Sequence, residues 1–176
     1  MKIAFLIIIF FGINSTSVFS QNWKITKNHK IAFSSSDVSG LFNEISGSII
    51  FDAANLETSK FQLTIPVESI QTGNSTQNKH AIGGDWFNAI SYPKIEFISN
   101  KIVKSENGFK AIGQMSIHGI SKDFTVPFTF DQKGSKGTFV AKFNLNRVEY
   151  AVGKSDSEES DNIKIQATIP VTKIKK

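Results

Sequence analysis

The stretch FVAKFNL at residues 139–145 alternates apolar with polar side chains and decides the fold of this 176-residue chain. Residues 61–65 (FQLTI) and 124–130 (FTVPFTF) repeat the pattern, and phenylalanine occupies most of the apolar positions. Successive side chains of a β-strand point to opposite faces, so each stretch has one apolar and one polar face. Such strands bury their apolar faces by closing on one another, and a closed antiparallel sheet can enclose an apolar ligand.

The same alternation recurs along the chain and predicts an all-β domain of about eight strands. Turn-forming residues at 52–55, 106–108 and 133–137 separate the strands, and connections this short join antiparallel neighbours. A helical pattern does not recur between the strands, which argues against a parallel βαβ sheet. We expect strands at residues 23–34, 45–52, 60–70, 95–104, 108–118, 122–131, 137–146 and 162–171.

Residues 1–20 do not follow this pattern. Lys2 provides a positive charge, residues 3–13 are apolar, and Val18, Phe19 and Ser20, which are small or tolerable at a cleavage site, precede Gln21. This order predicts a cleaved signal peptide over residues 1–20 and one barrel domain over residues 21–176. A transmembrane anchor is a weaker interpretation, because a span needs about 20 apolar residues and polar residues interrupt the run from Asn14 on. We therefore expect the protein in the periplasm, or secreted, with no transmembrane anchor after cleavage.

Composition narrows the classes of function. The chain has no cysteine, so it has no disulfide, no thiol nucleophile and no thiolate metal site. Its formal net charge is +5, but the lysines are spread singly and do not form the basic stripe of a nucleic-acid-binding protein. We expect no nucleic-acid partner, and weak attraction to anionic membrane surfaces stays open.

The interior of the predicted barrel holds either a ligand or only side chains. An eight-stranded barrel has room for either arrangement. Small residues at inward positions, Ala111, Gly113, Ala141 and Ala167, would leave volume between the phenylalanines or would only accommodate large neighbours. Periodicity does not decide between a tunnel and a solid core.

The alternation stops over residues 74–90. This segment contains Gly83 and Gly84, and it places the large aromatic side chains of Trp86 and Phe87 next to each other. We expect one or two short helical turns across the barrel mouth. They would form either a lid over a ligand or a loop whose aromatic residues plug the barrel end.

Arg147 is the only arginine of the chain, and it continues the inward parity of Phe143 and Leu145. A guanidinium carries five donors in a planar fork that suits bidentate pairing and stacking on aromatic rings. We favour an ion pair with a carboxylate such as Glu149 or Glu96. The alternative is a donor to the polar head of an otherwise apolar ligand.

Catalytic and metal-binding patterns are weak. His80 and Asp85 could act as a base and its orienting carboxylate, but no nucleophile accompanies them. The three histidines lack metal-ligand spacing, and the acidic run at residues 156–161 lacks the glycine and the spacing of a calcium loop. We predict no catalytic residue, no metal and no cofactor, with a hydrolase or isomerase that uses His80 and Asp85 as a minor alternative.

Several short segments resemble, in order and spacing, those of the YceI-like family of exported lipid-binding proteins. The most specific is YPKIEFIS at residues 92–99. The others are residues 29–33, 40–42, 47–52, 69–74, His80 with 85–87, 113–122 and 147–150. The chain departs from the family at Asn88, Asp123 and Ala151, where aspartate, proline and glycine are common.

The resemblance implies an eight-stranded antiparallel, lipocalin-like β-barrel that encloses a polyisoprenoid or an isoprenoid quinone, without catalysis. At roughly 0.3 kcal/mol per heavy atom, a chain of about forty carbons would contribute on the order of 10 kcal/mol to binding. A solid-core interaction module is the main alternative, and a homodimer stays open. The side chains expected to contact the lipid are Phe33, Phe51, Phe61, Trp86, Phe87, Phe97, Met115, Phe128, Phe130, Phe143, Leu145 and Arg147.

Overall fold

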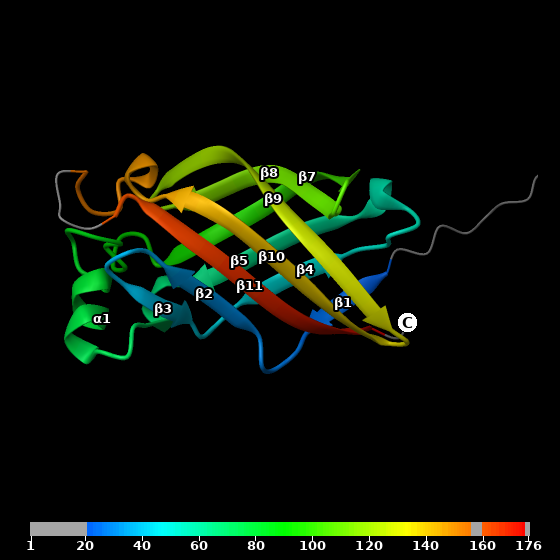
Figure 1. Ribbon diagram of the computed structural model, residues 1–176, viewed down its shortest axis with the longest axis horizontal. Helices are drawn as coiled ribbons and strands as arrows, with labels where there is room; N and C mark the ends of the chain where they lie inside the picture. Colours follow the sequence, from blue (N-terminus) through cyan, green and yellow to red (C-terminus); the bar gives the residue numbers. More distant parts are fainter. Residues whose placement is uncertain (1–20, 156–159, 175–176) are drawn as a thin grey trace, which may run out of the picture.

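The computed structural model describes residues 21–155 and 160–174 (Figure 1). The predicted signal peptide lies outside the described residues, as do residues 156–159 of the acidic run. The strands are β1 (Asn22–Ile25), β2 (Lys30–Ser34), β3 (Ser39–Phe42), β4 (Ser46–Ile50), β5 (Lys60–Pro66), β6 (Ile70–Gln71), β7 (Lys94–Ser105), β8 (Gly108–Ile117), β9 (Ile120–Lys133), β10 (Lys136–Asn146) and β11 (Asn162–Lys173). The helix is α1 (Ser75–Ile82), and 3-10 turns lie at Leu56–Thr58, Val67–Ser69 and Val148–Tyr150.

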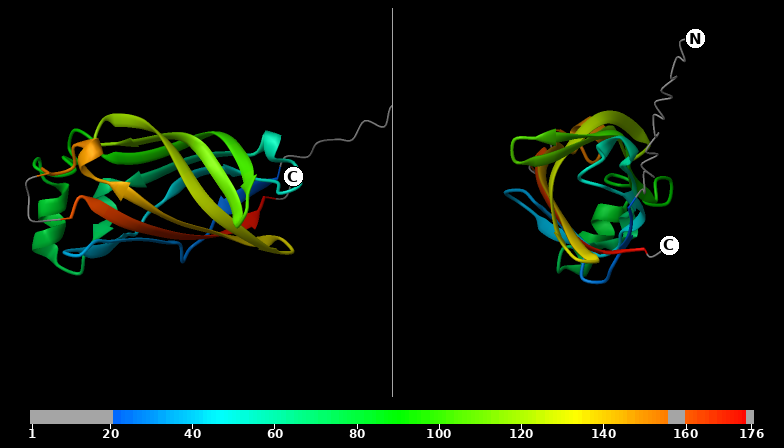
Figure 2. Two further views of the ribbon diagram at one scale, coloured as in Figure 1. Left: turned by 45° about the horizontal axis from the view of Figure 1, so that its top comes forward. Right: turned by 90° about the vertical axis from the view of Figure 1, so that its right-hand side faces the viewer.

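Eight of the strands close into an antiparallel barrel, as predicted. The ring runs β1, β4, β5, β7, β8, β9, β10 and β11, and the pairing of β11 with β1 closes it. Short turns connect β7, β8, β9 and β10 as successive hairpins. The end-on view of Figure 2 shows the strands wrapping around a common axis. Alternating side chains therefore point either into the barrel or out to solvent.

The single strand predicted at residues 23–34 is in fact two strands, so that prediction is wrong. Asn28 lies between β1 and β2 with a positive φ of 71°, which bends the chain. Both strands still lie along β11: β1 pairs near Val171, and β2 pairs with residues 164–168. From β2 the sheet continues through β3 to β6, outside the ring. The alternation of apolar and polar residues does not reveal where a strand bends. β3 and β6 are too short to show such an alternation.

The strand predicted at residues 60–70 is also interrupted. β5 ends at Pro66, a 3-10 turn follows, and β6 begins at Ile70. Proline has no N–H to donate to a neighbouring strand, so it suits a strand end. The turn directs β6 toward β3 and leads the chain into α1.

The helical segment expected within residues 74–90 is present as α1, at one end of the barrel (Figure 1). Asn74 caps the helix, because its side-chain oxygen accepts the N–H groups of Thr76 at 2.9 Å and Gln77 at 3.2 Å. The side-chain oxygen of Asn78 accepts the N–H of Thr72 at 2.8 Å. These bonds fix the position of the helix relative to β6.

Aromatic rings close the opposite end of the barrel. We call this set the aromatic plug: Trp23, Phe51, Phe61, Phe109, Phe128, Phe130 and Phe139. Phe51 is fully buried among them, with ring centroids of Phe109 at 5.0 Å and Phe130 at 5.1 Å. Trp23 Nε1 donates to the backbone oxygen of Phe51 at 2.9 Å, which satisfies the indole inside the plug. Edge-to-face ring contacts of this kind are favourable, so the end is densely packed.

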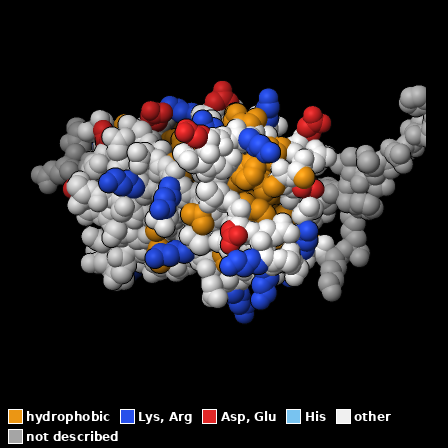
Figure 3. Space-filling view, turned by 45° about the vertical axis from the view of Figure 1, so that its right-hand side comes forward, with side chains coloured by type: hydrophobic (Ala, Val, Ile, Leu, Met, Phe, Trp, Pro, Cys, Tyr) orange, Lys and Arg blue, Asp and Glu red, His pale blue; other side chains and the backbone are white. Residues whose placement is uncertain are grey.

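The outer surface carries charges of both signs. On the face shown in Figure 3, lysine side chains are spread widely and acidic side chains lie mainly along the upper part. One exposed ion pair joins Lys122 Nζ to Glu149 Oε2 at 3.2 Å, and such pairs contribute about 1 kcal/mol at most. In residues 21–155 and 160–174, no helix has both the length and the apolar character needed to cross a membrane.

Candidate functional site

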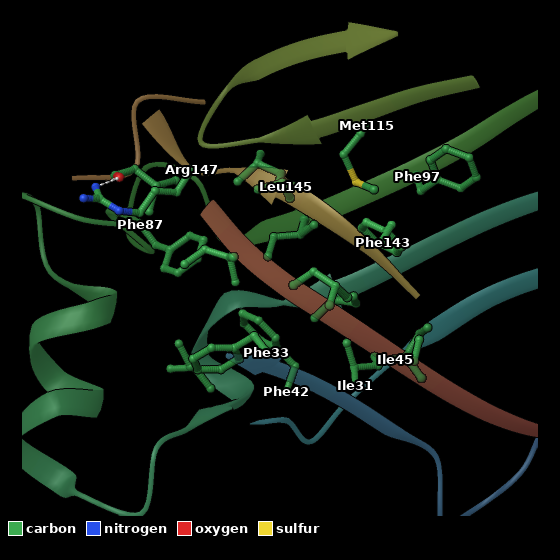
Figure 4. A pocket seen from close by; sticks show the side chains of 18 of the residues that line it. Ile31, Phe33, Phe42, Ile45, Phe87, Phe97, Met115, Phe143, Leu145 and Arg147 are labelled. Atoms are coloured by element: carbon green, nitrogen blue, oxygen red, sulfur yellow. Dashed lines mark hydrogen bonds between the residues drawn. The ribbon is translucent and has the colours of Figure 1, made fainter. Parts of the chain in front are cut away.

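The barrel is hollow between the aromatic plug and α1. A cavity of about 750 Å³ occupies its interior, near the upper end of the roughly 300–1,000 Å³ typical of ligand pockets (Figure 4). Isoleucine, leucine, valine, phenylalanine and methionine side chains from the strands line most of its length. Sequence periodicity left a tunnel and a solid core open, and the structure shows a hollow interior instead of a solid core.

Two small side chains on neighbouring strands help to provide this space. Ala141 of β10 and Ala167 of β11 are register partners, and both line the cavity. The other two small residues expected to leave volume do not contribute to it: Ala111 is fully buried, and Gly113 packs against the backbone of Ile98. A Cβ at residue 113 would lie 2.0 Å from the Ile98 oxygen, so the glycine permits close strand contact there and adds no space.

The floor of the cavity is the inner surface of the aromatic plug, formed by Phe61, Phe128 and Phe139. Phe51 and Phe130 were predicted to contact the lipid, but they do not line the cavity. Phe51 packs behind these floor rings, and Phe130 stacks on Phe139 at 4.3 Å. Both rings point into the barrel, as predicted, but they lie so far along it that they belong to the aromatic plug.

The position of the floor also limits how much ligand fits. At about 30 Å³ per methylene-sized group, the share of one water molecule in the liquid, the cavity holds on the order of 25 carbon atoms. This is less than the chain of about forty carbons considered from the sequence, because the aromatic plug fills one end of the barrel. A longer chain would keep part of its length outside.

Among the described residues, the polar side chains that line the cavity lie at the α1 end, which we call the mouth. They are Asp37, Thr72, Thr76, Gln77, His80 and Arg147. Asp37 lies in the turn between β2 and β3, and its carboxylate accepts the N–H of Ser160 at 2.7 Å and the hydroxyl of Ser36 at 2.8 Å. These two hydrogen bonds, with that from Ser160 the stronger, hold the pKa of Asp37 below its ordinary value. The carboxylate is therefore ionised at neutral pH.

Arg147 is buried at the mouth and fixes the loop that follows β10. Its Nε donates to the Ser160 oxygen at 3.1 Å, Nη1 to the Val152 oxygen at 2.8 Å, and Nη2 to the Lys154 oxygen at 3.1 Å. Nη2 also lies 3.2 Å from Asp161 Oδ1, in an ion-pair contact. The predicted carboxylate partners Glu149 and Glu96 were therefore wrong, although an ion pair was the favoured interpretation. The sequence could not identify Asp161 as the partner, because only the folded chain brings it next to Arg147.

The guanidinium also stacks on Trp86, with its carbon 5.0 Å from the ring centroid. Gly153 makes this packing possible: its φ is +69°, and a Cβ there would lie 2.6 Å from Arg147 Nη1 and 3.2 Å from the Trp86 ring. Trp86 and Phe87 both line the cavity beside Arg147. Both form part of the wall at the mouth: Trp86 stacks on Arg147, and Phe87 packs edge-to-face on Phe42 of β3.

The residues of the minor enzymatic alternative do not form a pair. His80 and Asp85 are both exposed, and within the described chain no hydrogen bond or ion pair joins them. The His80 ring instead lies 5.8 Å from that of Trp86. The described residues contain no group of three or more His, Asp or Glu side chains that could hold a metal.

Except for Phe51 and Phe130, every residue predicted to contact the lipid lines the cavity. These residues are Phe33, Phe61, Trp86, Phe87, Phe97, Met115, Phe128, Phe143, Leu145 and Arg147. The prediction missed many other lining residues, among them Ile31, Phe42 and Ile45. Ile31 shares parity with Phe33 and could have been found. Polar mouth residues such as Gln77 have no sequence signal that separates them from other loop residues.

Comparison with known proteins identifies relatives. A family model described as YceI-like domain matches residues 16–171. A UPF0312 protein of Yersinia pestis (strain Pestoides F) is 28% identical over 109 residues, which is 61% of this chain and 57% of the relative. The chain thus spans little more than half the length of that relative.

Solved structures share the barrel. BcnA of Burkholderia cenocepacia is 28% identical with a TM-score of 0.80, over 85% of this chain and 100% of that one. A polyisoprenoid binding domain from Saccharophagus degradans has a TM-score of 0.61 over 88% of this chain and 99% of that domain. Its identity is 13%, so this likeness shows the fold alone. The family match extends over nearly all of the barrel, and the chain belongs to the YceI-like domain family.

Proposed function

We propose that this protein is a non-enzymatic carrier that encloses the apolar chain of a lipid, a polyisoprenoid or isoprenoid quinone, inside its barrel. The single observation that carries the proposal is the cavity, whose described lining is apolar between the strands and polar at the mouth. A ligand with the same division, a long hydrocarbon tail and a small polar head, matches this lining. The fold shared with a polyisoprenoid binding domain supports the choice of an isoprenoid.

Hydrocarbon burial alone supplies enough affinity. At about 0.3 kcal/mol per heavy atom, roughly 25 buried carbons contribute about 7–8 kcal/mol. That corresponds to a dissociation constant of a few micromolar, on the order of 1–7 μM, without any catalytic or charged group. We expect no cofactor other than the lipid itself.

Residues 1–20 extend the proposal to location. Their charged start and apolar run are typical of a signal peptide, so the carrier would act in the periplasm or outside the cell. An aqueous compartment is where a long isoprenoid needs shielding from water.

The test is lipid extraction from protein purified from its own host, followed by mass spectrometry. We expect a stoichiometric isoprenoid in the wild type and its loss in Ala167→Trp, whose indole would occupy the cavity. The control is Gln166→Trp, on the adjacent, exposed position of β11, which should retain lipid. Thermal unfolding establishes that both variants fold. A folded Ala167→Trp protein with unchanged lipid content would refute the proposal.

A further inference from the structure

The mouth of the cavity contains a cation and a helix N-terminus, the two features that most often bind an anion in proteins. Both are already occupied by groups of the protein itself. This bears on which lipid head group the mouth can accept, an inference that rests on the proposed function.

The first feature is the Arg147 guanidinium. Three backbone oxygens accept from it, Asp161 lies 3.2 Å from its Nη2, and Trp86 covers one face. The carboxylate of Asp161 balances its charge. An anionic head group would have to displace these contacts, and displacement would leave buried oxygens such as that of Val152 without a donor.

The second feature is the N-terminus of α1. Its first-turn N–H groups at Thr76 and Gln77 donate to the side-chain oxygen of Asn74. A phosphate at this position would compete with the cap. The helix end is therefore closed to an anion unless the chain rearranges.

The remaining charge at the mouth is negative. Asp37 lines the cavity, and its two hydrogen bonds favour the ionised form. Among the described residues that line the cavity there is no lysine, and Lys79 of α1 is exposed outside the lining. Among the described lining residues, an anion placed here meets the Asp37 carboxylate and no lysine that would offset the repulsion.

Hydrogen-bonding side chains of α1 complete the mouth. Gln77 and His80 lie three residues apart on α1, which places them on one face of the helix, and both line the cavity. An amide and an imidazole offer donors and acceptors that suit a carbonyl, hydroxyl or ether oxygen. We propose that the lipid carried by this barrel has an uncharged oxygen-containing head group, and that lipids with phosphate heads are rejected at the mouth.

The test compares geranylgeraniol with geranylgeranyl phosphate, two probes with the same tail. Each displaces Nile red from delipidated full-length protein at neutral pH and low salt. We expect the alcohol to bind about tenfold or more tightly than the phosphate, because the phosphate charge finds no partner. Equal affinities, or tighter binding of the phosphate, would overturn the head-group inference while leaving the carrier function intact.

Two matched variants locate the effect. Asp37→Asn should narrow the preference for the alcohol a few-fold at low salt and less at high salt, since exposed charges are screened. Asp85→Asn removes an exposed carboxylate from the same end of the barrel, but outside the lining, and should leave the ratio unchanged. An equal effect of both variants would contradict the role given to Asp37. If neither probe displaces Nile red, and Ala167→Trp binds the dye as the wild type does, the carrier function itself fails.

Discussion

The division between cavity floor and sealed plug predicts opposite behaviour for two phenylalanines. Phe51 lies wholly within the aromatic plug, whereas Phe97 lines the cavity beside Met115. Both are buried, at 0% and 6% exposure, so burial alone does not distinguish them. Phe51→Leu should lower stability without changing lipid affinity. Phe97→Leu should lower lipid affinity with little loss of stability.

The magnitude follows from the ring contacts. Phe51 meets five other rings at centroid distances between 5.0 and 6.2 Å. Aromatic pairs contribute about 0.5–1.5 kcal/mol each and are not additive, and leucine refills most of the volume, so we expect a loss of about 2 kcal/mol. For a domain of this size that lowers the melting temperature by roughly 4–8 °C. Phe97 already faces open space on one side, so its replacement loses fewer contacts and costs about 1 kcal/mol or less.

The assay is thermal unfolding of delipidated protein, because bound lipid would itself raise the melting temperature. Geranylgeraniol affinity is then measured on the folded variants. If Phe51→Leu kept its melting temperature and lost lipid binding, the boundary between plug and cavity would be in the wrong place. Equal effects of the two variants on both measurements would contradict the reasoning as well.

Three further predictions concern polar groups. Arg147→Lys should lower the free energy of unfolding in urea by about 3 kcal/mol, because an ammonium cannot donate to all of the oxygens that the guanidinium binds. Asp161→Asn, at a partly exposed carboxylate, should lower it by about 1 kcal/mol or less. Comparable losses would contradict the role of Arg147 in holding the loop through its backbone oxygens. Ser99→Ala should cost about 1–3 kcal/mol, because the buried hydroxyl accepts the Phe61 N–H at 2.8 Å, and an unchanged urea midpoint would show that the bond is dispensable. Burial, assisted by the neighbouring carboxylate of Glu149, raises the pKa of Tyr150 above 10.0, so the unfolded chain loses this proton first and stability declines as the pH rises past 10. Tyr150→Phe should flatten that decline in urea titrations between neutral and alkaline pH, and an identical decline would show that other groups cause it.

Much of the cavity wall could be predicted from sequence because parity is a local property. The inward rows of β10 and β11 follow from alternation, and Phe143 and Leu145 line the cavity as expected. Parity fixes the face of a side chain but not its depth along the barrel. That is why Phe51 and Phe130 were grouped with the ligand contacts, although other rings cover them.

The mouth was beyond sequence reasoning for a different reason. Arg147 was singled out as the only arginine, yet its partners come from the following loop, from Val152 and Lys154 to Ser160 and Asp161. Its role depends on whether its N–H groups already donate to oxygens of the protein, and only the folded loop determines that. The same holds for the first turn of α1, where Asn74 occupies the N–H groups.

The sequence by itself determined an all-β chain with apolar inward faces, because strand geometry forces alternate side chains to opposite sides. Only the tertiary structure decided that these faces enclose open space, where that space ends, and which polar groups at its entrance are engaged. Those properties depend on how the rings and donors of distant segments fill the volume between the strands, and no local pattern encodes that packing.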